Sequence, residues 1–175
     1  MGMFLPTGRR VQALAMALFA VAASQAYSQD ATLSKPEGKT ILTIEGEISV
    51  TNSGSEAVFD RAMLEELGVK TVKTTTPWYD GDVTFEGVPM RVLLERVGSE
   101  GEELVARALN DYSTVIPISD FYDHDVILAL KRDGEYMEIS DKGPLFIVYP
   151  YDGENLHSQQ YYARSAWQVA RLVVR

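Results

Sequence analysis

The sequence contains no cysteine in its 175 residues. No disulfide can therefore stabilise the fold, and no thiolate metal ligand, cysteine nucleophile or lipidated cysteine is available. Histidine is also scarce, because His124 and His157 are the only two, which is too few for a His-rich metal site. A G-x-S-x-G elbow, a G-x-G-x-x-G loop and EF-hand spacing are missing as well. The sequence thus offers no self-sufficient catalytic machinery.

Positive charge is in short supply too. The 16 Lys and Arg residues stand against 25 Asp and Glu residues, which gives a net charge of −9. Residues 1–28 hold two basic and no acidic residues, so the remainder carries 14 basic against 25 acidic residues, a net charge of −11. A chain this acidic does not bind nucleic acid or anionic lipid through its overall charge, so no nucleic-acid partner is expected.

One long apolar run is present, at residues 11–23. It has the length of the hydrophobic region of a secretory signal and is too short to span a bilayer. Arg9 and Arg10 precede it and small residues follow it. We predict that residues 1–28 are a cleavable signal peptide and that the mature chain is periplasmic. The alternative is an uncleaved N-terminal anchor.

The rest of the chain predicts one domain. Residues 29–39 are polar, with Pro36 and Gly38, and are typical of a flexible lead. Residues 40–175 alternate between strand and helix patterns without repeats, which predicts a single α+β domain with an antiparallel or mixed sheet. Strands are expected at 40–48, 69–76, 82–88, 143–152 and 167–175, a hairpin at 125–139, helices at 55–68 and 89–98, and either a strand or a helix at 102–110.

Two local signals refine this prediction. Ser55 is a plausible N-cap and Gly68 a plausible C-terminal residue for the helix at 55–68, which has an apolar stripe. Asp80–Gly81 and Asp133–Gly134 are both strong turn signals. The first follows Trp78 and Tyr79, which would put these two aromatic rings beside a turn.

The acidic stretch Asp123–Asp125 contains His124 and could bind a metal. In an extended segment, however, alternate side chains point to opposite faces, so a solvated acidic loop is the favoured interpretation.

Aromatic residues gather at expected strand ends and loops, where ligand sites are common. Trp78 either fills the core or forms the floor of a pocket, where it could stack on a planar ligand. Trp167 lies on an apolar stretch and is expected in the core.

Several segments together resemble a known family. They are TTTPWYDGDVTFEGVPMRVLLERVG, ALNDYSTVIPISDF, DVILALKRDGEYMEISDKGPLFIVYP and RSAWQV. In this order and spacing they resemble the oxidoreductase molybdopterin-binding domain, which has the sulfite-oxidase fold. The resemblance covers roughly residues 40–175 and implies a single domain of mixed β-sheets with short helices.

The resemblance also points to a missing metal ligand. In enzymes of this fold, a cysteine four residues before a tryptophan binds molybdenum, and the corresponding residue before Trp78 is Thr74. A hydroxyl is a far poorer ligand for this metal than a thiolate. The chain is therefore similar to small, cysteine-free, periplasmic regulators of this family. This likeness implies that it binds a reduced, metal-free pterin without molybdenum, performs no catalysis, and signals to the periplasmic domain of a membrane enzyme that makes or degrades cyclic di-GMP.

A pterin needs a flat aromatic partner and hydrogen bonds along its aminopyrimidinone edge. Trp78 is expected to stack on it, and loop acids and amides are expected to accept from its N–H groups. Arg164 could close over the pocket or form a structural salt bridge. The complete set of predicted ligand-binding residues is Trp78, Thr74, Thr75, Asn110, Asp111, Tyr112, Asp120, Tyr149 and Arg164.

Two alternatives stay open at this point. The chain could be a molybdopterin-dependent oxidoreductase, although the missing thiolate and the lack of a haem motif oppose this. It could also be an interaction module without a ligand.

Overall fold

The computed structural model describes Gly2 and residues 32–175. The predicted signal peptide and the first part of the predicted lead lie outside these residues. The described part of the lead contacts the domain, because the backbone N–H groups of Glu37 and Gly38 donate to Asp60 at 2.9 and 2.7 Å. In the described part of the chain, no helix combines the length and the apolar character needed to cross a membrane.

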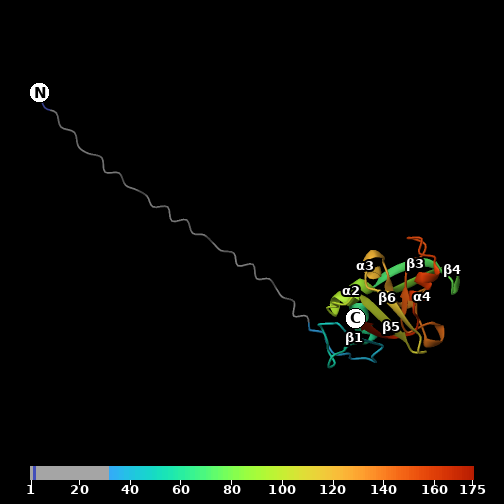
Figure 1. Ribbon diagram of the computed structural model, residues 1–175, viewed down its shortest axis with the longest axis horizontal. Coiled ribbons are helices and arrows are strands. Elements are labelled where there is room, and N and C mark those ends of the chain that lie inside the picture. The colour runs from blue at the N-terminus through green and yellow to red at the C-terminus, as the bar shows by residue number, and fades with distance from the viewer. Residues whose placement is uncertain (1, 3–31) are drawn as a thin grey trace.

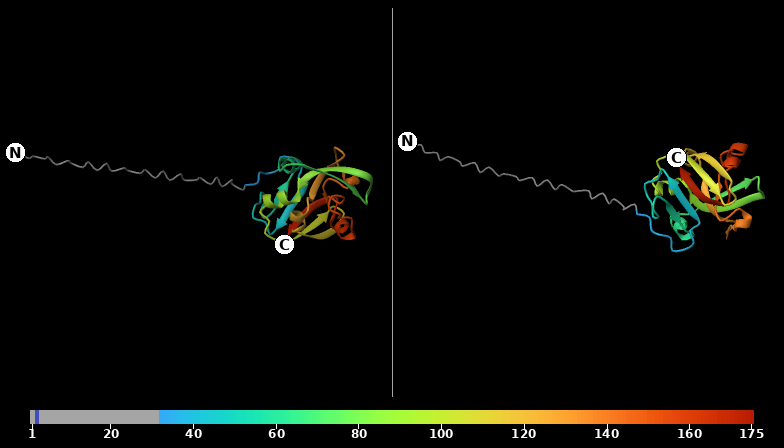
Figure 2. Two further views of the ribbon diagram at one scale, coloured as in Figure 1. Left: turned by 90° about the horizontal axis from the view of Figure 1, so that it is seen from above. Right: turned by 60° about the horizontal axis from the view of Figure 1, so that its bottom comes forward.

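The first sheet has five strands in the order β2-β1-β10-β5-β6 (Figures 1 and 2). β1 and β10 are parallel, and the other neighbours are antiparallel. The segment at 102–110, left open between strand and helix, is thus mainly strand. The members of this sheet are β1 (Leu42–Gly46), β2 (Ala57–Phe59), β5 (Glu103–Ala108), β6 (Ser113–Pro117) and β10 (Val169–Val174).

The second sheet is antiparallel and has the order β3-β4-β7-β8, with β9 also paired to β7. An isolated bridge between Phe146 and Trp167 connects β9 to the start of the last strand. Its members are β3 (Lys70–Thr76), β4 (Tyr79–Pro89), β7 (Ile127–Arg132), β8 (Glu135–Tyr136) and β9 (Phe146–Val148). The prediction of an α+β domain with mixed sheets is confirmed.

The helices are short. They are α1 (Arg61–Glu66), α2 (Met90–Arg96), α3 (Asp120–Asp123) and α4 (Gln159–Arg164), with a 3-10 turn at Ile139–Asp141. The helix expected at 89–98 is confirmed as α2, which begins after Pro89 and is followed by Gly98 at a φ of 60°. Figure 1 shows α3 and α4 beside β6.

The prediction of a helix at 55–68 is wrong for the first half of that range. Residues 57–59 form β2, which pairs with β1. The N-cap is Asp60 and not Ser55, because the Asp60 carboxylate accepts a hydrogen bond from the Met63 N–H at 2.9 Å. Strand pairing and a better cap therefore override the helical spacing of the apolar residues.

One core cluster takes side chains from both sheets. Phe59, Phe85 and Phe146 are fully buried within it, as are Leu42 and Leu128. Because both sheets contribute to one core, the loops at their ends are held at fixed positions relative to one another.

Candidate functional site

The β3–β4 hairpin carries Thr74, Thr75 and Trp78, three of the residues that were predicted to bind a ligand. Its turn lies at Pro77–Trp78, so the predicted turn at Asp80–Gly81 is wrong. These two residues lie inside β4 and form a bulge, because the strand register shifts there. Gly81 has a φ of 73°, which glycine adopts without a steric penalty. The bulge absorbs the two residues, and Trp78 itself becomes part of the turn.

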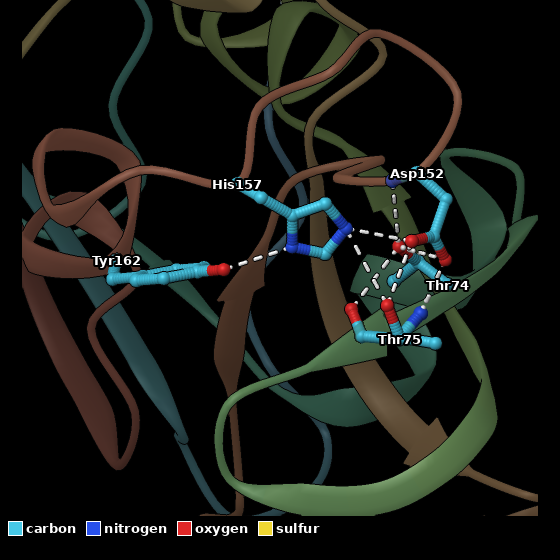
Figure 3. A network of polar contacts seen from close by, with 5 residues as sticks. All are labelled: Thr74, Thr75, Asp152, His157 and Tyr162. Atoms are coloured by element: carbon cyan, nitrogen blue, oxygen red, sulfur yellow. Dashed lines mark hydrogen bonds and ion pairs between the residues drawn. The ribbon is translucent and has the colours of Figure 1, made fainter.

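Thr74 and Thr75, near the end of β3, face the loop between β9 and α4. The Asp152 carboxylate of that loop accepts hydrogen bonds from the Thr75 N–H at 2.5 Å and the Thr75 hydroxyl at 2.7 Å. His157 Nε2 lies 2.6 Å from the same carboxylate, and His157 Nδ1 lies 2.8 Å from the Tyr162 hydroxyl. These contacts are shown in Figure 3. We call Thr74, Thr75, Asp152, His157 and Tyr162 the Asp152 cluster.

The Asp152 carboxylate is strongly favoured in its charged form. The hydrogen bonds from Thr75 lower the pKa of Asp152, with further lowering by His157 and Thr74, because hydrogen bonds to a carboxylate stabilise its charge. The Thr74 side chain is only 1% exposed. Its hydroxyl lies 3.2 Å from both the Asp152 carboxylate and the Thr75 carbonyl. The Thr74 hydroxyl therefore makes its contacts within the protein.

The Thr75 hydroxyl is not placed as the nucleophile of a hydroxyl–imidazole–carboxylate relay. In such a relay the hydroxyl and the carboxylate contact opposite nitrogens of the imidazole. Here the Thr75 hydroxyl, at 3.4 Å, and Asp152 both face His157 Nε2, while the other ring nitrogen faces Tyr162. The hydroxyl that lies opposite Asp152 across the imidazole is that of Tyr162, and the cluster as a whole holds the β9–α4 loop onto β3.

Trp78 is half-buried and contacts four other aromatic rings. The ring centroids lie 5.4 Å from Phe146, 5.5 Å from Trp167, 5.8 Å from Tyr162 and 6.3 Å from Tyr151, all in edge-on geometry. Such pairs are favourable beyond the area they bury. Trp167, expected in the core, is half-buried and packs against it. Trp78 thus packs at the border of the core and touches the Asp152 cluster through Tyr162.

The next residue, Tyr79, has two cations against its ring. The Arg132 guanidinium and the Lys142 ammonium lie 4.4 and 4.3 Å from the ring centroid. The Tyr79 hydroxyl donates to Asp141 at 3.0 Å. Burial, followed by this hydrogen bond, raises the pKa of Tyr79 to about 12. The hydroxyl therefore stays protonated at neutral pH.

Three of the predicted residues, Asp120, Tyr149 and Arg164, contact one another, and we call them the Asp120 cluster. The Tyr149 hydroxyl and the Arg164 guanidinium lie 2.8 and 2.7 Å from the same oxygen of Asp120. Tyr149 is fully buried, and the Asp120 and Arg164 side chains are 10% and 20% exposed. Burial raises the pKa of Tyr149 above its usual range. Arg164 thus forms the structural salt bridge that was one of its two expected roles.

His124 holds the β9–α4 loop from the side of α3. Its Nδ1 contacts the Glu154 carboxylate, and its Nε2 lies 3.3 Å from the Tyr161 hydroxyl. The flanking residues Asp123 and Asp125 are exposed, but Asp123 is the last residue of α3 and Asp125 pairs with Lys70 at 2.7 Å, so the stretch is only in part the predicted acidic loop. Among the residues that the structure describes, no three His, Asp or Glu side chains are grouped so that they could hold a metal ion.

The last predicted group, Asn110, Asp111 and Tyr112, lies in and after the exposed β5–β6 turn. The Asn110 side chain accepts from the Tyr112 N–H at 3.2 Å, and Asp111 has a φ of 65°. These contacts stabilise the turn. Only Tyr112 reaches toward the other groups, because its hydroxyl donates to the Ala163 carbonyl at 2.8 Å.

The short helix α4 connects all three groups. It supplies Tyr162 to the Asp152 cluster, Arg164 to the Asp120 cluster and the Ala163 carbonyl to Tyr112. The sequence analysis missed this helix, although Ser158 occupies its N-cap position before a run of good helix formers. It also missed Asp152 and His157 as site residues, because the segment around Asp152 has the composition of an ordinary turn.

A pocket of about 310 Å³ lies elsewhere. Leu42, Leu109, Ile139 and Arg171 are among its lining residues, and none of the predicted site residues lines it. Of the predicted residues, Thr75 and Trp78 are partly exposed and adjoin His157 and Tyr162, which were not predicted. A ligand at this surface would meet the partly exposed Trp78 and Tyr162 rings and the Thr75 hydroxyl.

Comparison with known families adds an independent finding. The oxidoreductase molybdopterin binding domain matches residues 53–154, which is more than half of the chain and includes Thr74, Trp78, Asp120 and Asp152. A comparison with curated proteins gives no match. The mixed sheet and the antiparallel sheet, with their short helices, agree with the sulfite-oxidase fold expected from the sequence. The chain belongs to the oxidoreductase molybdopterin binding domain family.

Proposed function

We propose that this chain is a non-catalytic, periplasmic pterin-binding protein that signals to a membrane enzyme of cyclic di-GMP metabolism. The family binds a pterin-type cofactor. The feature that carries the proposal is Thr74, which by resemblance corresponds to the metal-binding cysteine of enzymes of this fold. Its hydroxyl is buried and hydrogen-bonded to Asp152.

The residues present do not fit a molybdenum centre with a protein sulfur ligand. The whole sequence lacks cysteine, and molybdenum in this fold relies on a soft thiolate. A metal at Thr74 would also have to displace the contacts of its hydroxyl with Asp152 and the Thr75 carbonyl. The alternative of a molybdopterin-dependent oxidoreductase is therefore disfavoured by the donor set.

The residues present do fit the organic part of the cofactor. Trp78 and Tyr162 are half-buried aromatic rings, and a bicyclic pterin can stack on such rings or lie against their edges. The Asp152 and His157 side chains beside them are 43% and 37% exposed, so they can exchange hydrogen bonds with an aminopyrimidinone edge. Asp120, by contrast, already accepts from Tyr149 and Arg164 and serves better to fix α4.

Two observations support a signalling role in the periplasm. The predicted signal peptide at residues 1–28 would export the chain, and the sequence lacks the cysteine that would bind a catalytic metal in this fold. A protein that binds a ligand without converting it can act by presenting the bound form to a partner. The partner in this proposal is the periplasmic domain of a cyclic di-GMP cyclase or phosphodiesterase.

Mass spectrometry of the small molecules released from protein purified from a molybdenum-replete periplasm tests the proposal. We expect a pterin without stoichiometric molybdenum, measured on the same sample by elemental analysis. Stoichiometric molybdenum would contradict the proposal, and so would protein that neither retains a pterin nor binds added reduced pterin.

The variant Thr74→Cys tests where the ligand lies. Because Thr74 is 1% exposed, we expect the new thiol to react slowly with a small alkylating agent and more slowly still with bound pterin. A matched Thr71→Cys variant, on the exposed part of β3, should react quickly and be indifferent to pterin. Equal reaction rates at position 74 with and without saturating pterin would place the ligand elsewhere.

A further inference from the structure

The strands at the ends of the two sheets differ in how they are protected. β2 and β8 are only three and two residues long. β3 has seven residues but carries Lys70 and Lys73, and charged side chains on an edge strand discourage pairing with another chain. β6 has five residues, Ser-Thr-Val-Ile-Pro, and no charge. Among these four ends, β6 is the one that is longer than three residues and carries no charge, and its single proline, Pro117, is the last residue of the strand.

The outer backbone groups of β6 are open. Ala106 and Thr114 are partners in the antiparallel register, as are Leu104 and Ile116, and the neighbouring Ala108 N–H donates to the Tyr112 carbonyl. Because hydrogen bonds alternate along an antiparallel strand, Ser113 and Val115 direct their N–H and C=O groups away from β5. Within the described part of the chain, no backbone group bonds to either residue.

The side chains at this edge favour an apolar neighbour. Val115 is 42% exposed, whereas Ile116 on the other face is fully buried. In the strand register Val115 lies beside Val105, and Val105 lies beside Val173. An added strand would continue this row of valines with its own residue opposite Val115, where β-branched neighbours stabilise pairing.

The charges around β6 favour a basic neighbour. Asp111 lies before the strand, and Glu102 and Asp123 lie near its other end; all three are exposed. None of them forms an ion pair with another described residue. The exposed Arg107, which is the register partner of Ser113, is the one nearby cation of β5. Both ends of the edge therefore carry unpaired negative charge.

We propose that β6 is a docking edge for an extended segment of another protein, which pairs with it as an additional strand. The segment carries an apolar residue at its centre and Lys or Arg at both ends. This mode of recognition uses backbone hydrogen bonds for affinity and alternate side chains for specificity. A second copy of this chain would bring the same acidic flanks, so charge favours a foreign partner. The proposal goes beyond pterin binding and does not depend on it.

The test uses the complete mature protein and a fluorescent peptide of alternating Thr and Val flanked by lysines. Anisotropy should show saturable binding. A peptide with glutamate flanks should bind about tenfold more weakly, which corresponds to about 1.4 kcal/mol. A third peptide, N-methylated at alternate amides on its pairing side, should not bind, because it cannot form the strand hydrogen bonds.

Variants of the protein locate the site. Val115→Lys should weaken binding of the lysine-flanked peptide about tenfold or more, again about 1.4 kcal/mol. Thr71→Lys on the other long edge strand is the matched control and should bind as the wild type does. Ser113→Pro removes an outward N–H without touching the bonds to β5, and it keeps the test informative if Val115→Lys melts early.

Three results would overturn the proposal. One is absence of binding by the lysine-flanked peptide, and another is equal binding by its N-methylated form or by Val115→Lys. The third is sedimentation that shows wild-type self-association abolished by Val115→Lys, since β6 would then pair with a second copy of this chain.

Discussion

The Asp152 and Asp120 clusters are built from similar parts but lie at different depths. Each centres on an aspartate that contacts a hydroxyl group and a basic side chain. The Asp152 and His157 side chains are 43% and 37% exposed, whereas Asp120 and Arg164 are 10% and 20% exposed. Loss of a partner in the buried cluster leaves a charge inside the protein, but in the open cluster water replaces it. The Asp120 cluster should therefore control stability, and the Asp152 cluster should control the position of the loop.

The largest effect is expected for Arg164→Ala. This change leaves the nearly buried Asp120 carboxylate without its cation, which should lower the free energy of unfolding by about 3 kcal/mol, near the bottom of the range for breaking a buried pair. Urea unfolding measures it. Arg107→Ala, at an exposed arginine, is the control and should change stability by less than about 0.5 kcal/mol. Equal effects of the two variants would remove the distinction between the clusters.

Trp78→Ala should come next, because it affects both packing and the open cluster. Losing the edge-on contacts with Phe146 and Tyr162 should cost about 2 kcal/mol of stability, since each such pair contributes roughly 0.5–1.5 kcal/mol. Stacking on a pterin would be lost as well, which should weaken affinity by roughly 5- to 150-fold.

Melting temperature and pterin affinity must be measured on the same sample of this variant. Trp78→Phe keeps a flat ring and should retain much of the stability and much of the pterin affinity. If folded Trp78→Ala binds a pterin as tightly as the wild type, Trp78 only packs the border of the core.

Asp152→Asn should have a smaller effect that depends on pH. The pKa of Asp152 is lowered in the folded protein, so its charge stabilises the fold above the ordinary range of an aspartate, and this contribution disappears as the pH falls through the lowered value. The difference between wild type and variant should be within about 1 kcal/mol at neutral pH, as for exposed ion pairs, and should shrink in acid.

Denaturant unfolding over a pH series measures that difference, and hydrogen exchange of the Thr75 N–H reports the loop directly. Exchange at Thr75 should accelerate in Asp152→Asn and stay unchanged in Asp111→Asn. A stability difference that grows toward low pH would have the wrong sign for this account.

The smallest effect concerns Tyr79, which lies outside both clusters. Its pKa is raised to about 12, so the stabilisation by the neutral hydroxyl is complete below pH 10 and is lost as the pH rises through about 12. Tyr79→Phe should cost about 0.5 kcal/mol at neutral pH, the low end for one hydrogen bond, because Asp141 keeps its contact with Arg132. In an alkaline titration followed by tyrosinate absorbance, Tyr79→Phe should reduce the change near pH 12 and leave the change near pH 10 as in the wild type. Lost amplitude near pH 10 would contradict the buried environment.

The sequence was sufficient for the fold wherever one local pattern had no competitor. The alternation at 40–48 and the Pro89–Gly98 boundaries correspond to β1 and α2 in the structure. At 55–68 the helical stripe competed with pairing of β2 to β1 and with the carboxylate of Asp60, and the local pattern lost. Tertiary contacts of this kind override propensity.

The site was predictable as a set of residues but not as a set of contacts. Thr75 and Asp152 are 77 positions apart in the sequence, and nothing in the segment around Asp152 distinguishes it from a turn. Asp120, Tyr149 and Arg164 were expected to face a ligand, yet they satisfy one another. Whether such a side chain faces a ligand or a partner within the protein depends on how deeply it is buried. That depth is set by the packing of both sheets together.

Helix α4 has six residues, none of them buried. An isolated helix of this length is not stable in water, so its order depends on what it touches: the Asp152 cluster, the Asp120 cluster and Tyr112 beside β6. These three contacts share one helix, so a shift of α4 at one of them would alter the other two. Were occupancy of the pterin surface and of the neighbouring sheet edge coupled in this way, each would change the affinity of the other by the same factor.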